Sequence, residues 1–143
     1  MKTIILLLVT TLLTISCNVE PQPIEYGKDG CHFCKMTIVD RQHASQVVTN
    51  KGKVYKFDAI ECMINYTKEN KETEYAHIVV ADFRAPGTLI DAKNATYLIS
   101  PEISSPMGVF LSAFNSEKEA QKVQAEASGT TYSWSTLLNH LKK

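Results

Sequence analysis

Three sulfur donors fall in one short segment of the chain, Cys31-His32-Phe33-Cys34-Lys35-Met36. Cysteine thiolates and methionine thioethers are soft ligands, and sets of them select Cu(I) over hard cations. Because Cu(I) accepts few ligands, Cys34 and Met36 with one further sulfur would suffice to hold it. Cys31 is a further candidate ligand. The competing interpretation of Met36 is that it opens a strand and packs inward, but its position next to Cys34 favours the ligand role.

A second soft donor lies far away in the sequence. Met107 stands between Pro106 and Gly108, in a loop of turn-forming residues. Such a position is a poor one for the core face of a helix. If the second half of the chain folds back on the first, Met107 would close the metal site; packing in the core is the alternative.

The remaining cysteine and the histidines have simpler interpretations. Cys62 lies among apolar neighbours of a predicted helix, where a buried, inert cysteine is usual. His43 falls in a polar loop and is expected to be solvated, as is His32, for which a role as a metal ligand is the alternative. His77 opens an apolar segment and is expected in the core, and His140 lies near the C-terminus.

The N-terminus has the pattern of an export signal. A positive start at Met1-Lys2 precedes an apolar run over Ile4–Ile15, and Ser16-Cys17 follows. The run is shorter than the ~20 residues that a membrane span needs. A cysteine at this place resembles the lipidation site of bacterial lipoproteins, with an ordinary signal peptide as the alternative. We therefore expect a signal peptide over 1–16, a lipid on Cys17, a flexible tether over 17–30, and a periplasm-facing protein anchored to the outer membrane.

Composition limits the partners of the chain. It has 15 basic and 15 acidic side chains and a net charge of 0, so it lacks the electrostatic footprint of a nucleic-acid-binding protein. Contact with a membrane would come through the lipid rather than through a basic patch. Apart from Cys17, three cysteines remain, and an odd number argues against a disulfide framework.

The hydrophobic pattern predicts an α+β fold. We expect a short strand at 36–39, a hairpin of strands 46–49 and 53–57, a helix over 59–68 with Asp58 as its N-cap, and a strand at 77–80. These elements form a first β-β-α-β lobe over 31–84.

A second lobe is expected over 85–143, after the punctuation at Ala85-Pro86-Gly87. Its predicted strands are 88–90, 96–99 and 109–114, the last being either a strand or the start of a helix. A helix capped by Ser116 should run to Ala127 and end at Gly129, and a short amphipathic helix should cover 134–141.

The order of these motifs resembles the NosL family of copper-chaperone lipoproteins. The resemblance rests on Cys-x-x-Cys-x-Met, on Phe57-Asp58-Ala59-Ile60-Glu61-Cys62-Met63, and on Pro106-Met107-Gly108. It implies two lobes like those of organomercurial lyase, and a non-enzymatic role in delivering Cu(I) to nitrous oxide reductase. By position, Cys34 and Met36 match the metal-binding Cys and Met of the family, and Met107 matches a downstream Met. The chain has Lys35 where the family commonly has Gly, and His32 where it often has Pro.

Two other functions stay open at this stage. A Cys-x-x-Cys pair in an exported protein is also found in thiol–disulfide oxidoreductases, although these place the pair at a helix N-terminus after a strand. A zinc-stabilised structural lipoprotein would combine Cys31 and Cys34 with two histidines, but no histidine pair has the required spacing.

Overall fold

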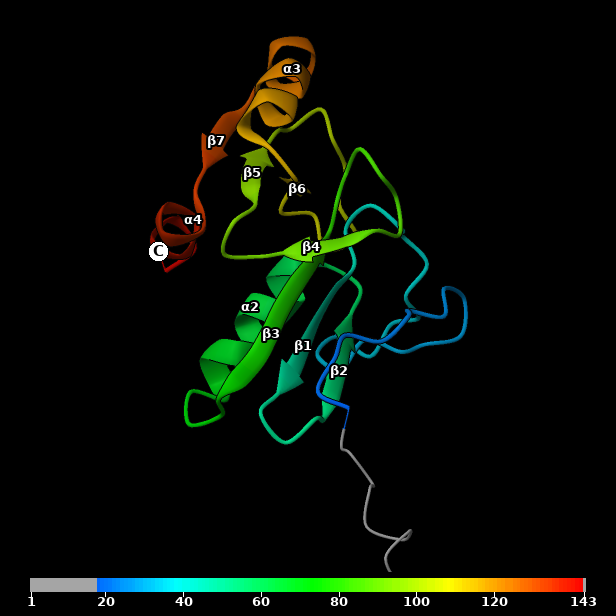
Figure 1. The fold of residues 1–143 in the computed structure, drawn as a ribbon. Coiled ribbons are helices and arrows are strands. Elements are labelled where there is room, and N and C mark those ends of the chain that lie inside the picture. The colour runs from blue at the N-terminus through cyan, green and yellow to red at the C-terminus, as the bar shows by residue number, and fades with distance from the viewer. Residues whose placement is uncertain (1–17, 143) are drawn as a thin grey trace, which may run out of the picture.

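A computed structural model describes residues 18–142 and contains two antiparallel sheets (Figure 1). The first sheet has four strands in the order β2-β1-β3-β4. Their bounds are Ser45–Thr49 for β1, Val54–Phe57 for β2, Tyr75–Ala81 for β3 and Leu89–Asp91 for β4. The predicted hairpin of β1 and β2 is confirmed, with Gly52 at φ 80° in its turn, a backbone conformation that glycine adopts without strain.

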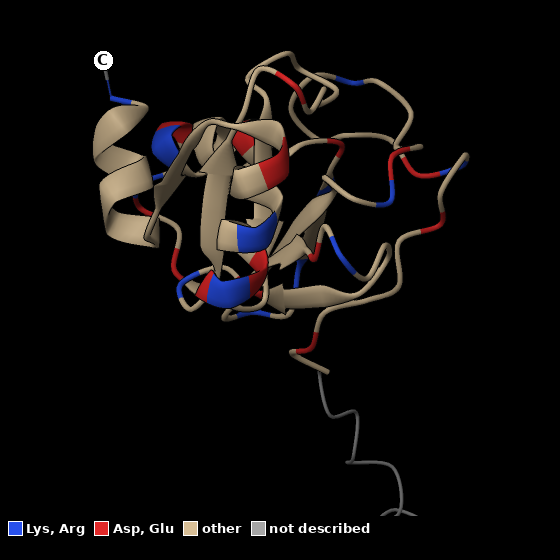
Figure 2. Cartoon of the chain, turned by 90° about the horizontal axis from the view of Figure 1, so that it is seen from above, with Lys and Arg blue, Asp and Glu red and all other residues tan. Residues whose placement is uncertain are grey.

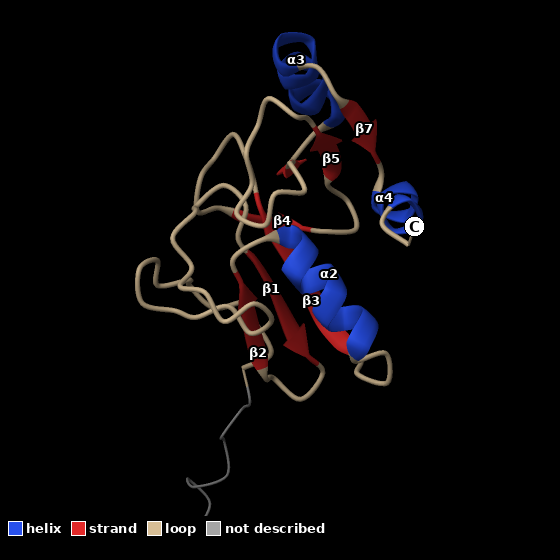
Figure 3. Cartoon of the chain, turned by 180° about the vertical axis from the view of Figure 1, so that it is seen from behind, coloured by secondary structure: helices blue, strands red, loops and turns tan. Residues whose placement is uncertain are grey.

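Helix α2, Ile60–Glu69, lies along one face of this sheet (Figures 1 and 3). Its buried face includes the predicted Ile60, Met63 and Ile64, which explains why this stretch is a helix rather than a strand. The predicted cap is wrong, because the N-cap position is Ala59 and no side chain caps the helix. Asp58 is instead buried one residue earlier.

The second sheet has three strands in the order β6-β5-β7. Its elements are β5 Thr96–Ile99, β6 Leu111–Phe114, α3 Glu117–Ala127 and β7 Thr130–Tyr132, and helix α4 follows at Trp134–His140. The predicted cap of α3 is confirmed, since the Ser116 side chain accepts a hydrogen bond from the backbone N–H of Glu119.

The two sheets repeat one topology. In each, the first strand of a β-β-α-β unit lies between the second and third strands, and all pairings are antiparallel. This confirms the predicted α+β fold with two related lobes. The strand predicted at 88–90 differs: as β4 it pairs with β3, with Val80 opposite Ile90, and so belongs to the first sheet. The punctuation at 85–87 is thus the turn of a hairpin, and the second unit begins after Asp91.

The core is continuous across both lobes. Tyr97, Leu111 and Leu137 of the second unit belong to the same buried cluster as Phe57 and Met63 of the first. Such a shared core makes the two lobes a single folding unit. Helix α4 closes one side of it, since Trp134 packs on Tyr97 with ring centroids 5.7 Å apart.

His43 is part of this junction, contrary to the prediction that it is solvated. It is 2 % exposed; its Nδ1 lies 2.9 Å from Asp40 Oδ2 and its Nε2 lies 3.1 Å from Ser112 Oγ of β6. The buried histidine therefore has polar partners in both lobes, the half-buried Asp40 and the buried Ser112. The prediction for His77 was also inaccurate: it is only half-buried, and its Nε2 lies 3.0 Å from the carbonyl oxygen of Val19.

The segment predicted as a flexible tether lies against the first lobe over most of its described part. Gln22 and Gln46 of β1 exchange two hydrogen bonds, at 2.7 and 2.8 Å. Asp29 forms a 2.7 Å ion pair with Lys56 of β2, and Ile24 packs on the core. The first lobe thus extends toward the N-terminus of the described chain. The signal peptide over 1–16 and the lipid on Cys17 lie outside the described residues.

Within residues 18–142 no helix has the length and apolar character to cross a bilayer. Acidic and basic residues alternate along the chain, on α3 in particular, instead of gathering on separate faces (Figure 2).

Candidate metal centre

The Cys-x-x-Cys-x-Met segment forms a tight loop closed by its own backbone. Cys31 N–H donates to the carbonyl oxygen of Met36 at 2.8 Å, and Lys35 N–H donates to the carbonyl oxygen of Cys31 at 3.1 Å. The strand predicted at 36–39 is absent, since only Thr37 makes a β-bridge, to Gly30. The chain folds back on itself here, so the loop has no neighbouring strand along which a ladder could continue.

Lys35 occupies a left-handed backbone conformation, with φ 67°. This conformation is unfavourable for residues with a Cβ, and glycine adopts it freely. The geometry gives a physical reason for the glycine that the resemblance leads us to expect at this position. Lys35 is held in place by a hydrogen bond of 2.7 Å from its Nζ to the carbonyl oxygen of His32.

Replacing Lys35 with glycine should stabilise the fold. Relief of the left-handed conformation contributes about 1 kcal/mol, partly offset by the greater freedom of glycine in the unfolded chain. We expect the free energy of unfolding in urea to rise by about 0.5 kcal/mol. A matched Lys51→Gly change, at an exposed position without this conformation, should not raise it. A destabilised Lys35→Gly protein would show that the hydrogen bond to His32 outweighs the strain.

Three cysteine sulfurs meet beneath this loop. The Sγ atoms of Cys31, Cys34 and Cys62 all lie within 4.8 Å of one another, and none is in a disulfide. Cys62 lies in the first turn of α2, the helix that follows β2. Cys31 is 2 % and Cys62 1 % exposed, whereas Cys34 is half-buried. Cys31 and Cys62 are therefore covered by protein, and Cys34 is the cysteine of the cluster that solvent or a partner protein can reach.

The three thiols differ in acidity because of their hydrogen bonds. The Cys62 thiol donates to Cys31, and the backbone N–H groups of Asp58, Cys34 and Phe33 also bond this sulfur, so the pKa of Cys31 falls to about 4 against the opposing effect of burial. The same interaction with Cys31, with burial, raises the pKa of Cys62. Burial raises the pKa of Cys34. At neutral pH the cluster thus holds one thiolate and two thiols.

Two buried carboxyl groups stand beside the cluster. Asp58 is 1 % and Glu61 5 % exposed, and Asp58 Oδ1 and Glu61 Oε2 have no hydrogen-bond partner. Burial raises the pKa of both. Their charged forms are disfavoured, which limits the negative charge that surrounds the thiolate.

The two methionines lie at the surface, so neither packs in the core. Met36 is 52 % and Met107 41 % exposed. The Met107 loop reaches the first turn of α2, where Ser105 Oγ donates to Glu61 Oε1 at 3.3 Å. Both methionine loops therefore approach the end of α2 that carries Cys62. Coordination of copper by Met36 and Met107 stays a prediction.

The structure thus unites Cys31 and Cys34, as predicted, with a residue that sequence reasoning missed. The burial expected for Cys62 is confirmed, and its sulfur lies in the cluster, a proximity that the sequence did not predict. The signal available in the sequence was the odd cysteine count: a third thiol without a disulfide partner, at the start of the helix that follows the Phe57-Asp58 pair.

The geometry of the cluster fits neither the zinc site nor the thiol–disulfide oxidoreductase considered above. Among residues 18–142, only the three cysteines form a group with metal-site spacing, so the zinc site with two histidines is not assembled. The Cys-x-x-Cys pair lies in a turn rather than at a helix N-terminus, and its first cysteine is buried. Both features differ from those of thiol–disulfide oxidoreductases, whose attacking cysteine is accessible.

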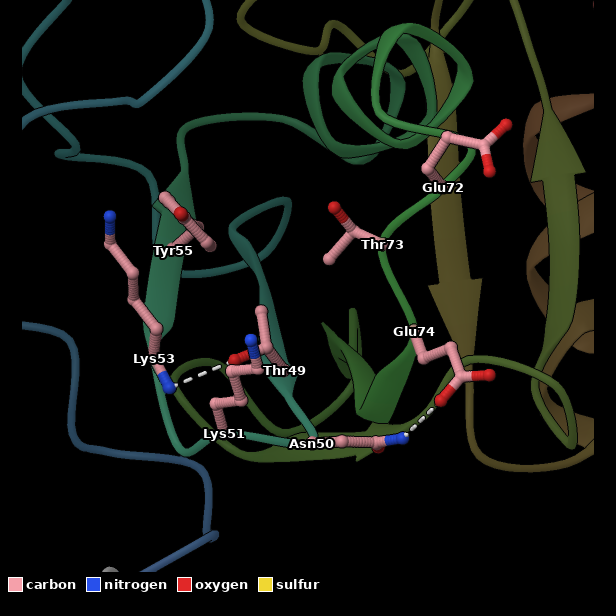
Figure 4. A pocket seen from close by; sticks show the side chains of 8 residues that line it. All are labelled: Thr49, Asn50, Lys51, Lys53, Tyr55, Glu72, Thr73 and Glu74. Atoms are coloured by element: carbon pink, nitrogen blue, oxygen red, sulfur yellow. Dashed lines mark hydrogen bonds between the residues drawn. The ribbon is translucent and has the colours of Figure 1, made fainter.

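A cavity of about 450 Å³ lies elsewhere, between the β1–β2 hairpin and the segment after α2 (Figure 4). Its polar wall includes Lys53, Tyr55 and Glu72, and Asn50 Nδ2 donates to Glu74 Oε2 at 2.9 Å across its rim. None of its lining residues is a cysteine, methionine or histidine. This cavity therefore offers no thiol, thioether or imidazole ligand to a transition metal.

Comparison with known proteins decides the family. The NosL family model matches residues 23–141, which is most of the chain and includes the whole thiol cluster. The chain belongs to the NosL family. Among solved structures, the copper chaperone NosL from Shewanella denitrificans matches with a TM-score of 0.69 and 19 % identity, covering 81 % of this chain and 93 % of that one. At this identity the match establishes the NosL fold. Comparison with curated protein sequences gives no match.

Proposed function

We propose that this NosL-family protein is a metallochaperone that binds Cu(I) and passes it to a copper-receiving enzyme. Its family and the copper chaperone that shares its fold support copper as the cargo. The observation that carries the proposal is the cluster of Cys31, Cys34 and Cys62. Reduced thiols at this spacing, with thioethers nearby, are the donor set that soft Cu(I) prefers.

The difference in exposure between the cysteines suits a carrier. A metal in transit needs one ligand that a partner can reach, and the half-buried Cys34 is that ligand. The exposed Met36 and Met107 provide exchangeable thioethers in the two neighbouring loops. Copper would leave through this face by exchange of ligands, without any change in its oxidation state.

The first test is an anaerobic Cu(I) titration of the reduced protein against a chromogenic chelator. We expect one Cu(I) per chain, with tight binding lost in Cys34→Ala and the transfer of Cu(I) to the chelator slowed in Met36→Leu and Met107→Leu. Val39→Ala is the matched control, since Val39 is an exposed residue of the same loop without a donor atom. Unchanged affinity in Cys34→Ala would refute the site.

The recipient that the resemblance favours is nitrous oxide reductase. Mixing the copper-loaded chaperone with copper-free reductase should transfer the metal faster than free Cu(I) at the same buffered activity. Equal rates would remove this enzyme as a specific partner. Copper centres in other extracytoplasmic enzymes would then be the candidates.

Anchoring through a lipid on Cys17 would hold the carrier at the periplasmic face of the outer membrane. The export pattern of residues 1–17 supports this location. A Cys17→Ala change should move the protein from the membrane fraction to the soluble fraction. Retention in the membrane would argue against the lipid.

A further inference from the structure

We infer that Cys62 is a third thiolate ligand, which completes with Cys31 and Cys34 a trigonal resting position for Cu(I). This inference deepens the proposed function and rests on it. It adds a ligand from α2 to the loop that carries the Cys-x-x-Cys-x-Met motif.

The spacing of the sulfurs carries the inference. With metal–thiolate bonds of about 2.3 Å, as zinc sites show, three sulfurs in a plane around one metal lie about 4.0 Å apart. The three Sγ atoms already lie within 4.8 Å of one another. Each sulfur therefore needs to move by less than about 1 Å to reach the trigonal arrangement. Rotation about the side-chain bonds of the cysteines allows such a movement without moving the backbone.

The surroundings of the cluster also favour ligation over simple packing. Cys62 is the third residue of α2, so its sulfur lies at the helix end that stabilises negative charge. None of the three cysteines is in a disulfide, so all three sulfurs are available to a metal.

The chemistry is ligand exchange. Cu(I) arrives with the ligands of its donor and bonds first to the half-buried Cys34, whose thiol proton passes to solvent. Cys62 likewise loses its thiol proton to solvent as its Cu–S bond forms, and the last donor ligand leaves. Reversal through Cys34 returns the metal to the surface. Because Cys31 and Cys62 are almost fully buried, the resting metal is protected from other thiols.

The test uses the reduced protein with Cu(I) alone as the probe. X-ray absorption of the wild type should show three sulfur neighbours at one short thiolate distance. Cys62→Ser should reduce this to two thiolates, with or without a longer thioether. It should also lower the Cu(I) affinity by more than about 10-fold, the least that loss of even an outer-sphere partner of a metal usually costs.

The control is Ile64→Val, a core change on the same helix that removes no donor; it should keep both the sulfur count and the affinity. Since the absorption measurement on the wild type needs no variant, a Cys62→Ser protein that fails to fold leaves the inference testable. Two thiolates in the wild type, or an unchanged affinity in a folded Cys62→Ser protein, would overturn the inference and leave the proposed function standing. Absence of Cu(I) binding in the wild type would overturn both.

Discussion

The affinity of the protein for Cu(I) should fall about 100-fold for each unit of pH lost between about pH 8 and pH 5. Metal ligands bind as thiolates, so every thiol that is still protonated must release a proton when copper binds. The pKa of Cys31 lies at about 4, so this sulfur is already ionised over the whole range. Those of Cys34 and Cys62 are raised above their ordinary value, so a trithiolate site releases two protons.

The sign follows from these protons. Protons are a product of the binding reaction, so lowering the pH weakens the binding of Cu(I). The dependence on pH disappears only when the pH rises to the pKa values of Cys34 and Cys62. Titrations against a chelator whose own protonation is known, at pH 5, 6, 7 and 8, give the slope. The Cys62→Ser change should halve the slope of log affinity against pH, so that the affinity falls about 10-fold per unit of pH. A wild-type slope of about 10-fold per unit would mean that only one thiol loses a proton.

Replacing Gly129 with alanine should cost about 3–5 kcal/mol of stability. Gly129 has φ 102°, and an added Cβ would lie 2.3 Å from the carbonyl oxygen of Ile99 and 2.9 Å from Ser100 Cα. Both contacts are with backbone, which has little room to yield. The loss combines a strained backbone conformation with overpacking at the junction of α3 and β7. It is large compared with the total stability of a protein, about 5–15 kcal/mol.

Two other glycines separate these causes. Gly108 has the left-handed conformation, with φ 72°, but no atom lies within 4 Å of an added Cβ. Gly108→Ala should therefore lower the free energy of unfolding by only about 1 kcal/mol. Gly30→Ala has neither feature and should be close to neutral. Urea unfolding of the three variants checks the order. Equal losses in Gly129→Ala and Gly108→Ala would show that the backbone around Gly129 moves aside.

Local patterns in the sequence were sufficient where an element depends on its own residues. The β1–β2 hairpin follows from alternation and an Asn-Lys-Gly turn, and α3 from its Ser116 cap and the Gly129 that follows its end. The sulfur-rich loop was recognisable for the same reason, since Cys31, Cys34 and Met36 are neighbours in sequence. The family resemblance followed from these short motifs.

Predictions that depended on distant partners were less accurate. Whether the strand after Gly87 joins the first sheet or the second depends on which edge is free, and the edge of β3 is available to it. His43 looked like a loop residue because its partner Ser112 is 69 residues away. The segment at 22–30 looked like a linker because its hydrogen bonds are made with side chains of β1 and β2.

The sequence by itself determined which donor groups this protein offers: soft sulfur side chains, their order in the loop, and the helix that carries Cys62. Only the tertiary structure decided that Cys62 joins Cys31 and Cys34, that Cys34 alone of the three is accessible, and that both methionines face outward. The physical reason is that residue types are local properties of the chain. The distance between two sulfurs on a loop and a helix depends on how α2 packs against its sheet.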